Sequence, residues 1–435
     1  MSSAKQEVIA AFPQRLGWWG TVRWLRSERS HSAILSGSMI LLIGAVVVGA
    51  FNFGYNVLVA RLLGPAAFGH ASAAGTLLML VSAITLSFQL VCAKFMALNE
   101  TPGARLAVYQ SLRRRSWTVG MLLAAAIAAG SAPLARYLNL PTPWIVLLLA
   151  FGMAFYVPLG AKRGALQGTC AFPRLTLNFV LESVVKFAAA FALVLLGYGV
   201  LGAVGAIAAS VILAYFLLPL GAQFRGTPEA ALPASFREGM QAIVFFVGQV
   251  IINNIDILLV KHFFRPQEAG LYAAVALVGR VLYFASWQVV SAMFPISAGT
   301  KTRRRNASVL AVPLLLVVSI ATAFILLLSV FPGAIVHFVF GAGFREAEPL
   351  LSLYAAATGC YALSVVLMAY EMSRRIANTG WLQLVFSGLL VLGISLFHAT
   401  LREVVIVQVV LMVALLAAVS LPFFRMKFST AQEAA

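Results

Sequence analysis

Asp256 is the only aspartate in the chain, and it lies in a long apolar stretch with two amide side chains nearby. Gln249, Asn253 and Asp256 are spaced four and three residues apart, which places them on one face of a helix. A charge at the centre of a bilayer costs about 3 kcal/mol or more, so an ionisable residue there is a functional candidate. We expect this polar stripe to face a cavity, with Asp256 as a candidate for ion coupling. Two alternatives stay open: Asp256 pairs with a neighbouring helix and fixes packing, or it lies near the outer interface and is hydrated.

Arg280 is the second candidate, because Tyr283 and Trp287 follow it at helical spacing. A guanidinium group binds two phosphate oxygens at once, and aromatic faces suit sugar rings or a prenyl chain. The face therefore predicts a site for a phosphorylated, partly apolar ligand. An intramembrane ion pair between Arg280 and Asp256 is the competing interpretation, and a pair that opens to a phosphate would satisfy both.

Glu182 and Lys186 stand four residues apart, in the order that favours a salt bridge within one helix. As a neutralised pair they would cost little inside a bilayer. Alternatively, Lys186 is a second cation that attracts phosphate, and Glu182 is a group that titrates during ion coupling. Asn52, in another apolar stretch, is a further candidate binding residue.

The amino-acid composition indicates what kind of structural elements hold these candidate residues. Of the 435 residues, 62% are hydrophobic and 10% charged, whereas soluble domains carry about 25% charged residues. The 13 acidic residues against 31 Lys and Arg give a net charge of +18. A soluble enzyme and a nucleic-acid binder are both excluded, because neither class has so little polar surface. The three cysteines (Cys92, Cys170 and Cys360) indicate neither a disulfide framework nor a metal site.

Apolar runs broken by glycine, proline and charge predict an all-α membrane protein with twelve transmembrane helices. The helices are expected at 36–60, 69–97, 116–136, 143–165, 175–197, 200–222, 238–263, 270–297, 307–330, 347–372, 380–399 and 402–424. With both termini in the cytoplasm, 23 Lys and Arg residues fall on the inside and 6 on the outside. This bias predicts a multi-pass membrane protein with cytoplasmic N- and C-termini.

A weak internal repeat joins the two halves at a constant offset of 201 residues. Asn52, Leu58, Val59, Pro65 and Gly69 are matched by Asn253, Leu259, Val260, Pro266 and Gly270. Each half has an even number of helices, so the halves are expected to be two six-helix lobes related by an axis along the membrane normal. The predicted domains are a basic N-terminal segment (1–35), an N-lobe (36–222), a cytoplasmic linker (223–237), a C-lobe (238–424) and a cytoplasmic tail (425–435).

Four short stretches carry a family resemblance: VLVARLLGPAAFG, DILLVKHFFRPQEAGLY, KRGALQG and VFGAGFREAEPLLSLYAAA. They resemble the Wzx-type polysaccharide-biosynthesis flippases of the multidrug/oligosaccharidyl-lipid/polysaccharide exporter superfamily. The resemblance implies a V-shaped pair of six-helix lobes that moves a polyprenyl-diphosphate-linked oligosaccharide across the inner membrane, for exopolysaccharide, O-antigen (lipopolysaccharide) or capsule synthesis. It also implies membrane lipids, a polysaccharide polymerase and export machinery as partners, and no nucleic acid.

Two other functions are compatible with parts of the sequence. A cation-coupled multidrug exporter would share the fold, although the first four predicted helices lack the carboxylate that such exporters commonly use. A membrane polymerase or ligase is disfavoured, because we find neither an enzyme signature nor a long outer loop with carboxylates. The sequence thus predicts a transporter that is not an enzyme, without catalytic residues, cofactor or metal. His70, His262, His337 and His398 are expected to be interfacial side chains rather than ligands.

Overall fold

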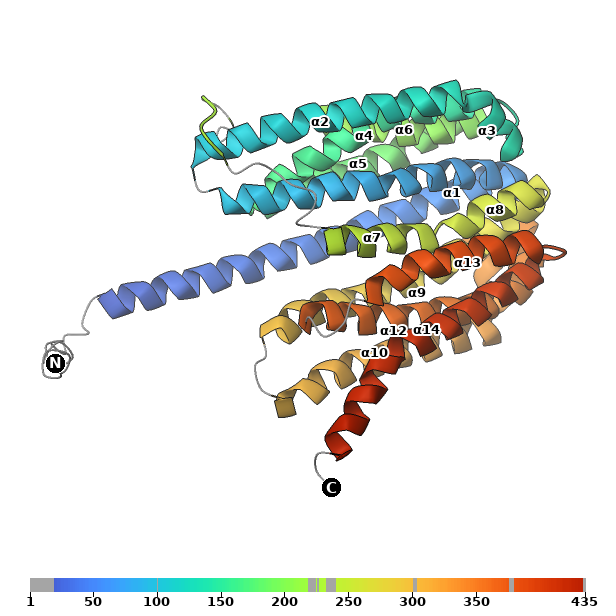
Figure 1. Ribbon diagram of the computed structural model, residues 1–435. Helices are drawn as coiled ribbons and strands as arrows, with labels where there is room; N and C mark the ends of the chain where they lie inside the picture. The colour runs from blue at the N-terminus through green and yellow to red at the C-terminus, as the bar shows by residue number, and fades with distance from the viewer. Residues whose placement is uncertain are drawn as a thin grey trace, which may run out of the picture.

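The computed structural model describes residues 19–99, 101–217, 224, 227–231, 240–299, 303–374 and 379–432. All long elements in this part of the chain are helices that run roughly parallel to one another (Figure 1). We call the end where α1 begins and α14 ends the tail end, and the opposite end, which holds α3 and α11, the cap end. Residues 1–18 of the predicted N-terminal segment (1–35) and most of the predicted linker (223–237) lie outside the described residues.

The N-lobe is built from α1 to α6, and the C-lobe from α7 to α14. The N-lobe elements are α1 (Trp19–Leu98), α2 (Pro102–Ala129), α3 (Ser131–Tyr137), α4 (Trp144–Gly168), α5 (Phe172–Leu193), η1 (Val194–Tyr198) and α6 (Gly199–Leu217). The C-lobe elements are α7 (Met240–Ile252), α8 (Ile255–Phe263), α9 (Pro266–Gly299), α10 (Arg303–Val330), α11 (Pro332–Val339), η4 (Ala342–Leu350), α12 (Leu351–Arg374), η5 (Thr379–Trp381), α13 (Leu382–Leu396) and α14 (Leu401–Gln432).

The described helices agree with the twelve predicted spans. Nine ranges are long and apolar enough to cross a membrane, and the bent pair α2–α3 is a tenth. Two of these ranges each hold two helices, because glycines with positive φ turn the chain at Gly64 (φ 78°) in α1 and at Gly197 (φ 90°) in η1. We call the two parts of α1 its first arm (19–63) and second arm (65–98). The protein is therefore a multi-pass all-α membrane protein, with the connections predicted to be cytoplasmic at its tail end.

Three helices extend well beyond the predicted spans. α1 begins at Trp19 rather than near residue 36, α2 begins at Pro102 rather than at 116, and α14 continues to Gln432 beyond the predicted boundary at 424. All three extensions are rich in polar residues, and the prediction stopped where the apolar run stopped. Loss of hydrophobicity ends a membrane span, but it does not end a helix, since the backbone hydrogen bonds continue until a breaker intervenes.

Close glycine packing assembles the N-lobe. Gly160, Gly164 and Gly168 recur every four residues on α4, and a Cβ on any of them would lie 2.4 Å from a carbonyl oxygen of the second arm of α1. Small residues at this spacing let two membrane helices approach closely and gain van der Waals contact. The KRGALQG stretch (162–168) is the last part of α4, which continues three residues beyond the predicted boundary at 165.

The buried apolar residues divide unevenly between the ends of the molecule. One cluster runs through the N-lobe and the cap-end half of the C-lobe, from Tyr55 and Val59 to Val405. A second cluster, with Phe245, Val366 and Leu415, is confined to the tail-end half of the C-lobe. The two lobes therefore share an apolar core at the cap end, whereas the C-lobe has its own core at the tail end.

Candidate functional site

The seventh predicted span is broken in its middle, and this break organises the C-lobe site. The helix stops at Ile252 and resumes at Ile255, with Asn254 (φ −133°) capping α8. Asn253 and Asn254 donate side-chain hydrogen bonds to the carbonyls of Gln249 (2.8 Å) and Val250 (2.7 Å). Asparagine competes in this way with the helical pattern, so two in succession favour an interruption. Gln249 and Asp256 thus lie on two short helices, not on one continuous stripe as the spacing predicted.

Asp256 lies in the first turn of α8 and is 1% exposed. Its Oδ2 accepts three hydrogen bonds, from the hydroxyls of Tyr272 (2.9 Å) and Tyr354 (3.0 Å) and from Nε2 of Gln408 (2.9 Å). The partial positive charge at a helix N-terminus also favours a carboxylate there. Oδ1 is buried without a partner, so this carboxylate is held by neutral donors and keeps one oxygen available.

Arg280 lies at the other side of the break. Its Nη2 donates to the carbonyl of Asn253 (2.6 Å), where the C-terminal end of α7 favours a cation, and its Nε is buried without a partner. Among the described residues, Arg280 and Asp256 do not form an ion pair within 4.0 Å. The alternative prediction of a direct salt bridge between these two residues is therefore wrong. The two charges are instead placed by the two ends of the interrupted helix.

The aromatic face predicted beside Arg280 is present but partly packed. The Tyr283 ring stacks on Trp287, with centroids 6.4 Å apart, and on Tyr361 of α12, with centroids 5.8 Å apart. A small cavity of about 30 Å³ lies beside Asn253, Tyr354, Thr358, Tyr361 and Gln408. That volume accommodates one water molecule or one small cation.

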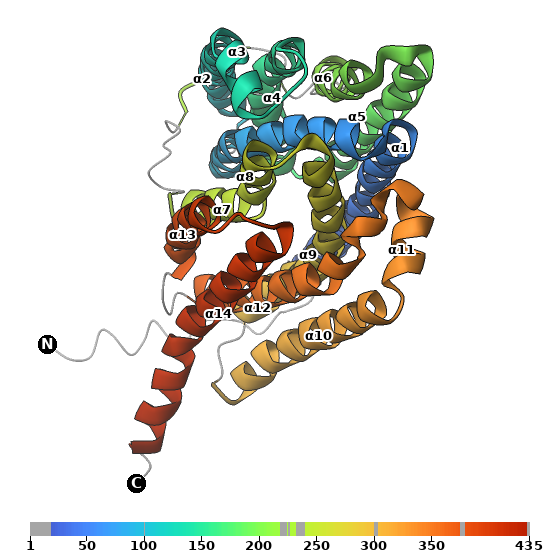
Figure 2. The same cartoon turned by 90° about the vertical axis from the view of Figure 1, so that its right-hand side faces the viewer.

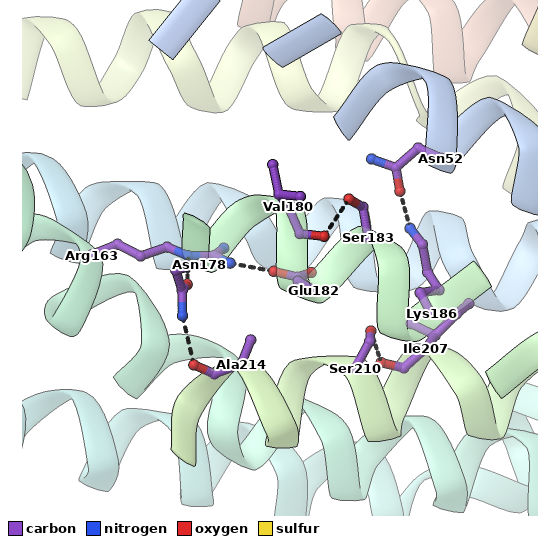
Figure 3. A network of polar contacts seen from close by, with 10 residues as sticks. All are labelled: Asn52, Arg163, Asn178, Val180, Glu182, Ser183, Lys186, Ile207, Ser210 and Ala214. Carbon is purple, nitrogen blue, oxygen red and sulfur yellow. Dashed lines mark hydrogen bonds and ion pairs between the residues drawn. The ribbon is translucent and has the colours of Figure 1, made fainter. Parts of the chain in front are cut away.

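In the N-lobe, Glu182 pairs with Arg163 of α4 and not with Lys186, so the expected intrahelical salt bridge is wrong (Figure 3). Nε of Arg163 donates to Oδ1 of Asn178 (2.7 Å), and Nδ2 of Asn178 donates to the carbonyl of Ala214 (2.7 Å). Arg163 is 4% exposed, and its guanidinium carbon lies 3.9 Å from the centre of the Phe179 ring. This network ties α4, α5 and α6 together.

Lys186 instead contacts the first arm of α1. Its Nζ donates to Oδ1 of Asn52 and lies 5.2 Å from the centre of the Tyr55 ring (Figure 3). Lys186 is the fifteenth residue of α5, and Arg280 is the fifteenth of α9. About 21 Å of helix precedes each of them, so both cations lie within the depth of a 30 Å hydrocarbon core.

Each cation donates a hydrogen bond to one of two repeat-related asparagines, but to different groups of them. Nζ of Lys186 donates to the side-chain Oδ1 of Asn52, whereas Nη2 of Arg280 donates to the backbone carbonyl of Asn253, 201 residues further on. Sequence reasoning had identified all four residues as candidates, but it had not paired them.

Four important residues were missed: Arg163, Tyr272, Tyr354 and Gln408. Arg163 lies at the very end of the fourth predicted helix (143–165), where a cation reads as a membrane-surface residue, and the tyrosines resemble ordinary interfacial side chains in a sequence. Gln408 was the detectable one, because a glutamine within the apolar run of the twelfth predicted span is as unusual as Gln249.

Comparison with known proteins agrees with this architecture. No curated protein sequence matches the chain. An inward-facing multidrug resistance MATE family transporter of the MOP superfamily aligns with a TM-score of 0.71 at 13% identity, covering 91% of this chain and 99% of the other. The outward-facing conformation of such a transporter gives 0.57 at 17% identity, covering 93% and 97%.

A MOP superfamily transporter from Pyrococcus furiosus, whose binding pocket is described as having reverse polarity, gives 0.56 at 16% identity and covers 92% and 96%. At these identities the likeness shows a shared fold of two six-helix lobes. A family model described as "Polysaccharide biosynthesis protein" matches residues 57–349, about two thirds of the chain. Because this match covers more than half of the chain, the protein belongs to the polysaccharide biosynthesis protein family.

Proposed function

We propose that this protein is a transporter that flips a polyprenyl-diphosphate-linked oligosaccharide across the bacterial inner membrane. The observation that carries the proposal is one intramembrane cation in each lobe: Lys186, which bonds the side chain of Asn52, and Arg280, which bonds the backbone of Asn253. A diphosphate carries two phosphate groups, and each of them loses its hydrating water when it enters the membrane. One cation from each lobe would compensate for that loss by binding a phosphate group. Membership of a polysaccharide-biosynthesis family supports this cargo.

The asparagines hold the cations without neutralising them. An amide oxygen is a weaker partner than a phosphate oxygen, since hydrogen bonds between two charged groups are the stronger ones. Each cation therefore gains by exchanging its asparagine for a phosphate. By contrast, Arg163 is neutralised by Glu182 and is not available for such an exchange.

Asp256 is our candidate for ion coupling. Its Oδ1 is buried without a partner, and two of the residues that donate to Oδ2, Tyr354 and Gln408, line the cavity of about 30 Å³, so the carboxylate is placed to bind a small cation. Interrupted helices at mid-membrane commonly mark ion and substrate sites in secondary transporters. Glu182, the other carboxylate proposed from the sequence, is the weaker candidate because Arg163 already neutralises it.

The test is transbilayer movement of a fluorescent polyprenyl-diphosphate oligosaccharide in proteoliposomes, read with a membrane-impermeant quencher. Lys186→Gln and Arg280→Gln are each expected to lower the initial rate at least tenfold, because each removes one of two phosphate contacts. Arg345→Gln is the matched control, since the Arg345 side chain is 86% exposed and its Nε lies 4.0 Å from the Glu348 carboxylate. Full activity of both intramembrane variants would exclude the proposed phosphate contacts.

The same assay separates flipping from the second candidate function, a cation-coupled exporter of small amphiphiles. The unpartnered Oδ1 of Asp256 favours that function, because a cationic cargo or coupling ion would suit it. An exporter predicts loss of dye efflux in Asp256→Asn and tolerance of Arg280→Gln, since a cationic drug gains nothing from arginine. Flipping by the wild type, abolished in Arg280→Gln, would exclude the exporter.

A further inference from the structure

The two lobes meet at the cap end through residues that the 201-residue repeat relates to each other. A Cβ on Gly69 would lie 2.8 Å from the carbonyl oxygen of Pro266, and a Cβ on Gly270 would lie 1.8 Å from that of Pro65. These two contacts are reciprocal under the repeat, because Pro65 corresponds to Pro266 and Gly69 to Gly270. The pseudo-two-fold axis therefore passes through a backbone-to-backbone contact that only glycine permits.

An arginine bridges the lobes on one side of this contact. Arg61, near the end of the first arm of α1, donates from Nε to the carbonyl of Val339 (2.9 Å) and from Nη2 to that of Phe338. These carbonyls belong to the last two residues of α11. The C-terminal end of a helix carries partial negative charge, so the guanidinium is favoured there by both hydrogen bonding and the helix dipole.

A histidine bridges the lobes on the other side. Nδ1 of His262, near the end of α8, donates to the carbonyl of Tyr137 (2.7 Å), which is the last residue of α3. The His262 and Tyr137 rings also stack, with centroids 3.9 Å apart and an interplanar angle of 11°. His262 was expected to be an interfacial side chain rather than a ligand, and the structure adds that it contacts the other lobe.

The two bridges are equivalent under the repeat. His262 lies 201 residues after Arg61, and Phe338 lies 201 residues after Tyr137. In each case a side chain at the end of one lobe's first span reaches the C-terminal carbonyl of the short helix in the other lobe. Figure 2 looks onto this end and shows α11 and α3 on different sides of the molecule.

We propose that Arg61 and His262 are the two arms of a latch that holds the cap end shut and limits how often the lobes separate there. The inference rests on the proposed transport function, in which the lobes must open at each end in turn. No other role is needed to explain why a cation and an imidazole, far apart in sequence, each bind a helix end across the lobe interface.

Neighbouring contacts strengthen each arm differently. Beside the His262 arm, Nδ2 of Asn139 donates to the carbonyl of His262 (2.9 Å), and Nζ of the fully buried Lys261 donates to that of Asn139 (3.3 Å). Beside the Arg61 arm, Phe68 packs on Phe344, with ring centroids 5.9 Å apart. One side of the latch is therefore backed by polar contacts, and the other by aromatic packing.

The chain offers matched controls for both arms. Arg136 and His337 are again an arginine of the N-lobe and a histidine of the C-lobe, 201 residues apart. They lie exposed in α3 and α11, at the same end of the molecule, and make no contact across the lobes that the structure records. Arg61→Ala and His262→Ala are therefore compared with Arg136→Ala and His337→Ala.

The experiment measures the distance between spin labels at Ala132→Cys in α3 and Ala334→Cys in α11, in nanodiscs. Cys92, Cys170 and Cys360 are first replaced in the full chain. Loss of a charge-assisted arm is expected to raise the ratio of separated to closed lobes about tenfold in Arg61→Ala. The rise in His262→Ala is expected to be smaller, and the two control variants should match the unaltered chain.

Distance distributions that are the same in Arg61→Ala, His262→Ala and the controls would overturn the latch. Gly270→Ala gives an independent check, because its Cβ collides with the backbone of the other lobe and should favour separation even with both arms intact. The readout requires no cargo, so it also separates the two proposals: failure of lipid flipping with a normal latch response would overturn only the proposed function.

Discussion

The two lobes differ in backbone structure at equivalent positions of the repeat. The N-lobe has Asn52, Phe53 and Tyr55 where the C-lobe has Asn253, Asn254 and Asp256. The first arm of α1 continues through this point as an unbroken helix, whereas the C-lobe helix stops and restarts. Because the second asparagine interrupts the hydrogen-bond ladder, the C-lobe gains two helix ends at mid-membrane, one for a cation and one for a carboxylate.

The charges of the two lobes are also balanced differently. Glu182 in the N-lobe is neutralised by Arg163, while Asp256 in the C-lobe is held by two tyrosine hydroxyls and an amide. A carboxylate fixed by an opposite charge stabilises the fold, and one fixed by neutral donors can still bind a cation. We therefore expect substitutions in the N-lobe network to affect stability, and those at the C-lobe site to affect transport.

The largest predicted effect on stability is that of Arg163→Met, which leaves Glu182 without its partner in the membrane. Breaking a buried ion pair on one side costs about 3–5 kcal/mol in free energy of unfolding. The double variant Arg163→Met with Glu182→Gln should recover much of that loss, because no charge remains unpaired. Thermal unfolding in detergent measures both, and equal melting temperatures for the single variant and the wild type would contradict the structural role.

An intermediate effect on stability is predicted for Tyr354→Phe in the C-lobe. It removes one of three donors to the Asp256 carboxylate, and hydrogen bonds to charged groups contribute about 1.5–3 kcal/mol. Tyr361→Phe is a matched control on the same helix, since its hydroxyl donates to the neutral Oε1 of Gln383 (2.7 Å) and should contribute about 1 kcal/mol. Equal losses for the two variants in chemical denaturation would contradict the expected extra strength of the bond between Tyr354 and Asp256.

The smallest effect on stability is predicted for Lys186→Met. Its ammonium has an amide as its hydrogen-bonding partner, so the lost hydrogen bond and the removed desolvation cost nearly cancel, leaving a change within about 1 kcal/mol. Lipid flipping should fall at least tenfold in the same variant. Retained flipping with a large loss of stability would instead make Lys186 a structural residue like Arg163.

The candidate site was only partly predictable from the sequence. Asn52, Lys186, Asn253, Asp256 and Arg280 stood out because polar residues are costly in apolar spans, and this cost is local to each residue. Their partners were not predictable, since helical spacing suggests only neighbours within one helix. Helical spacing thus suggested that Glu182 pairs with Lys186, whereas the structure pairs Glu182 with Arg163 of another helix. Arg163 also donates to Asn178, and Asn178 in turn donates to the carbonyl of Ala214.

The sequence by itself determined that the chain is a bundle of membrane helices, where those helices lie, and that its halves are repeats. It could do so because a helix in hydrocarbon satisfies its own backbone, so the apolar run alone defines the span. Only the tertiary structure decided which side chains meet. Gln408 reaches Asp256 from 152 residues away and Arg61 reaches Phe338 from 277, and such pairs arise from the packing of whole helices.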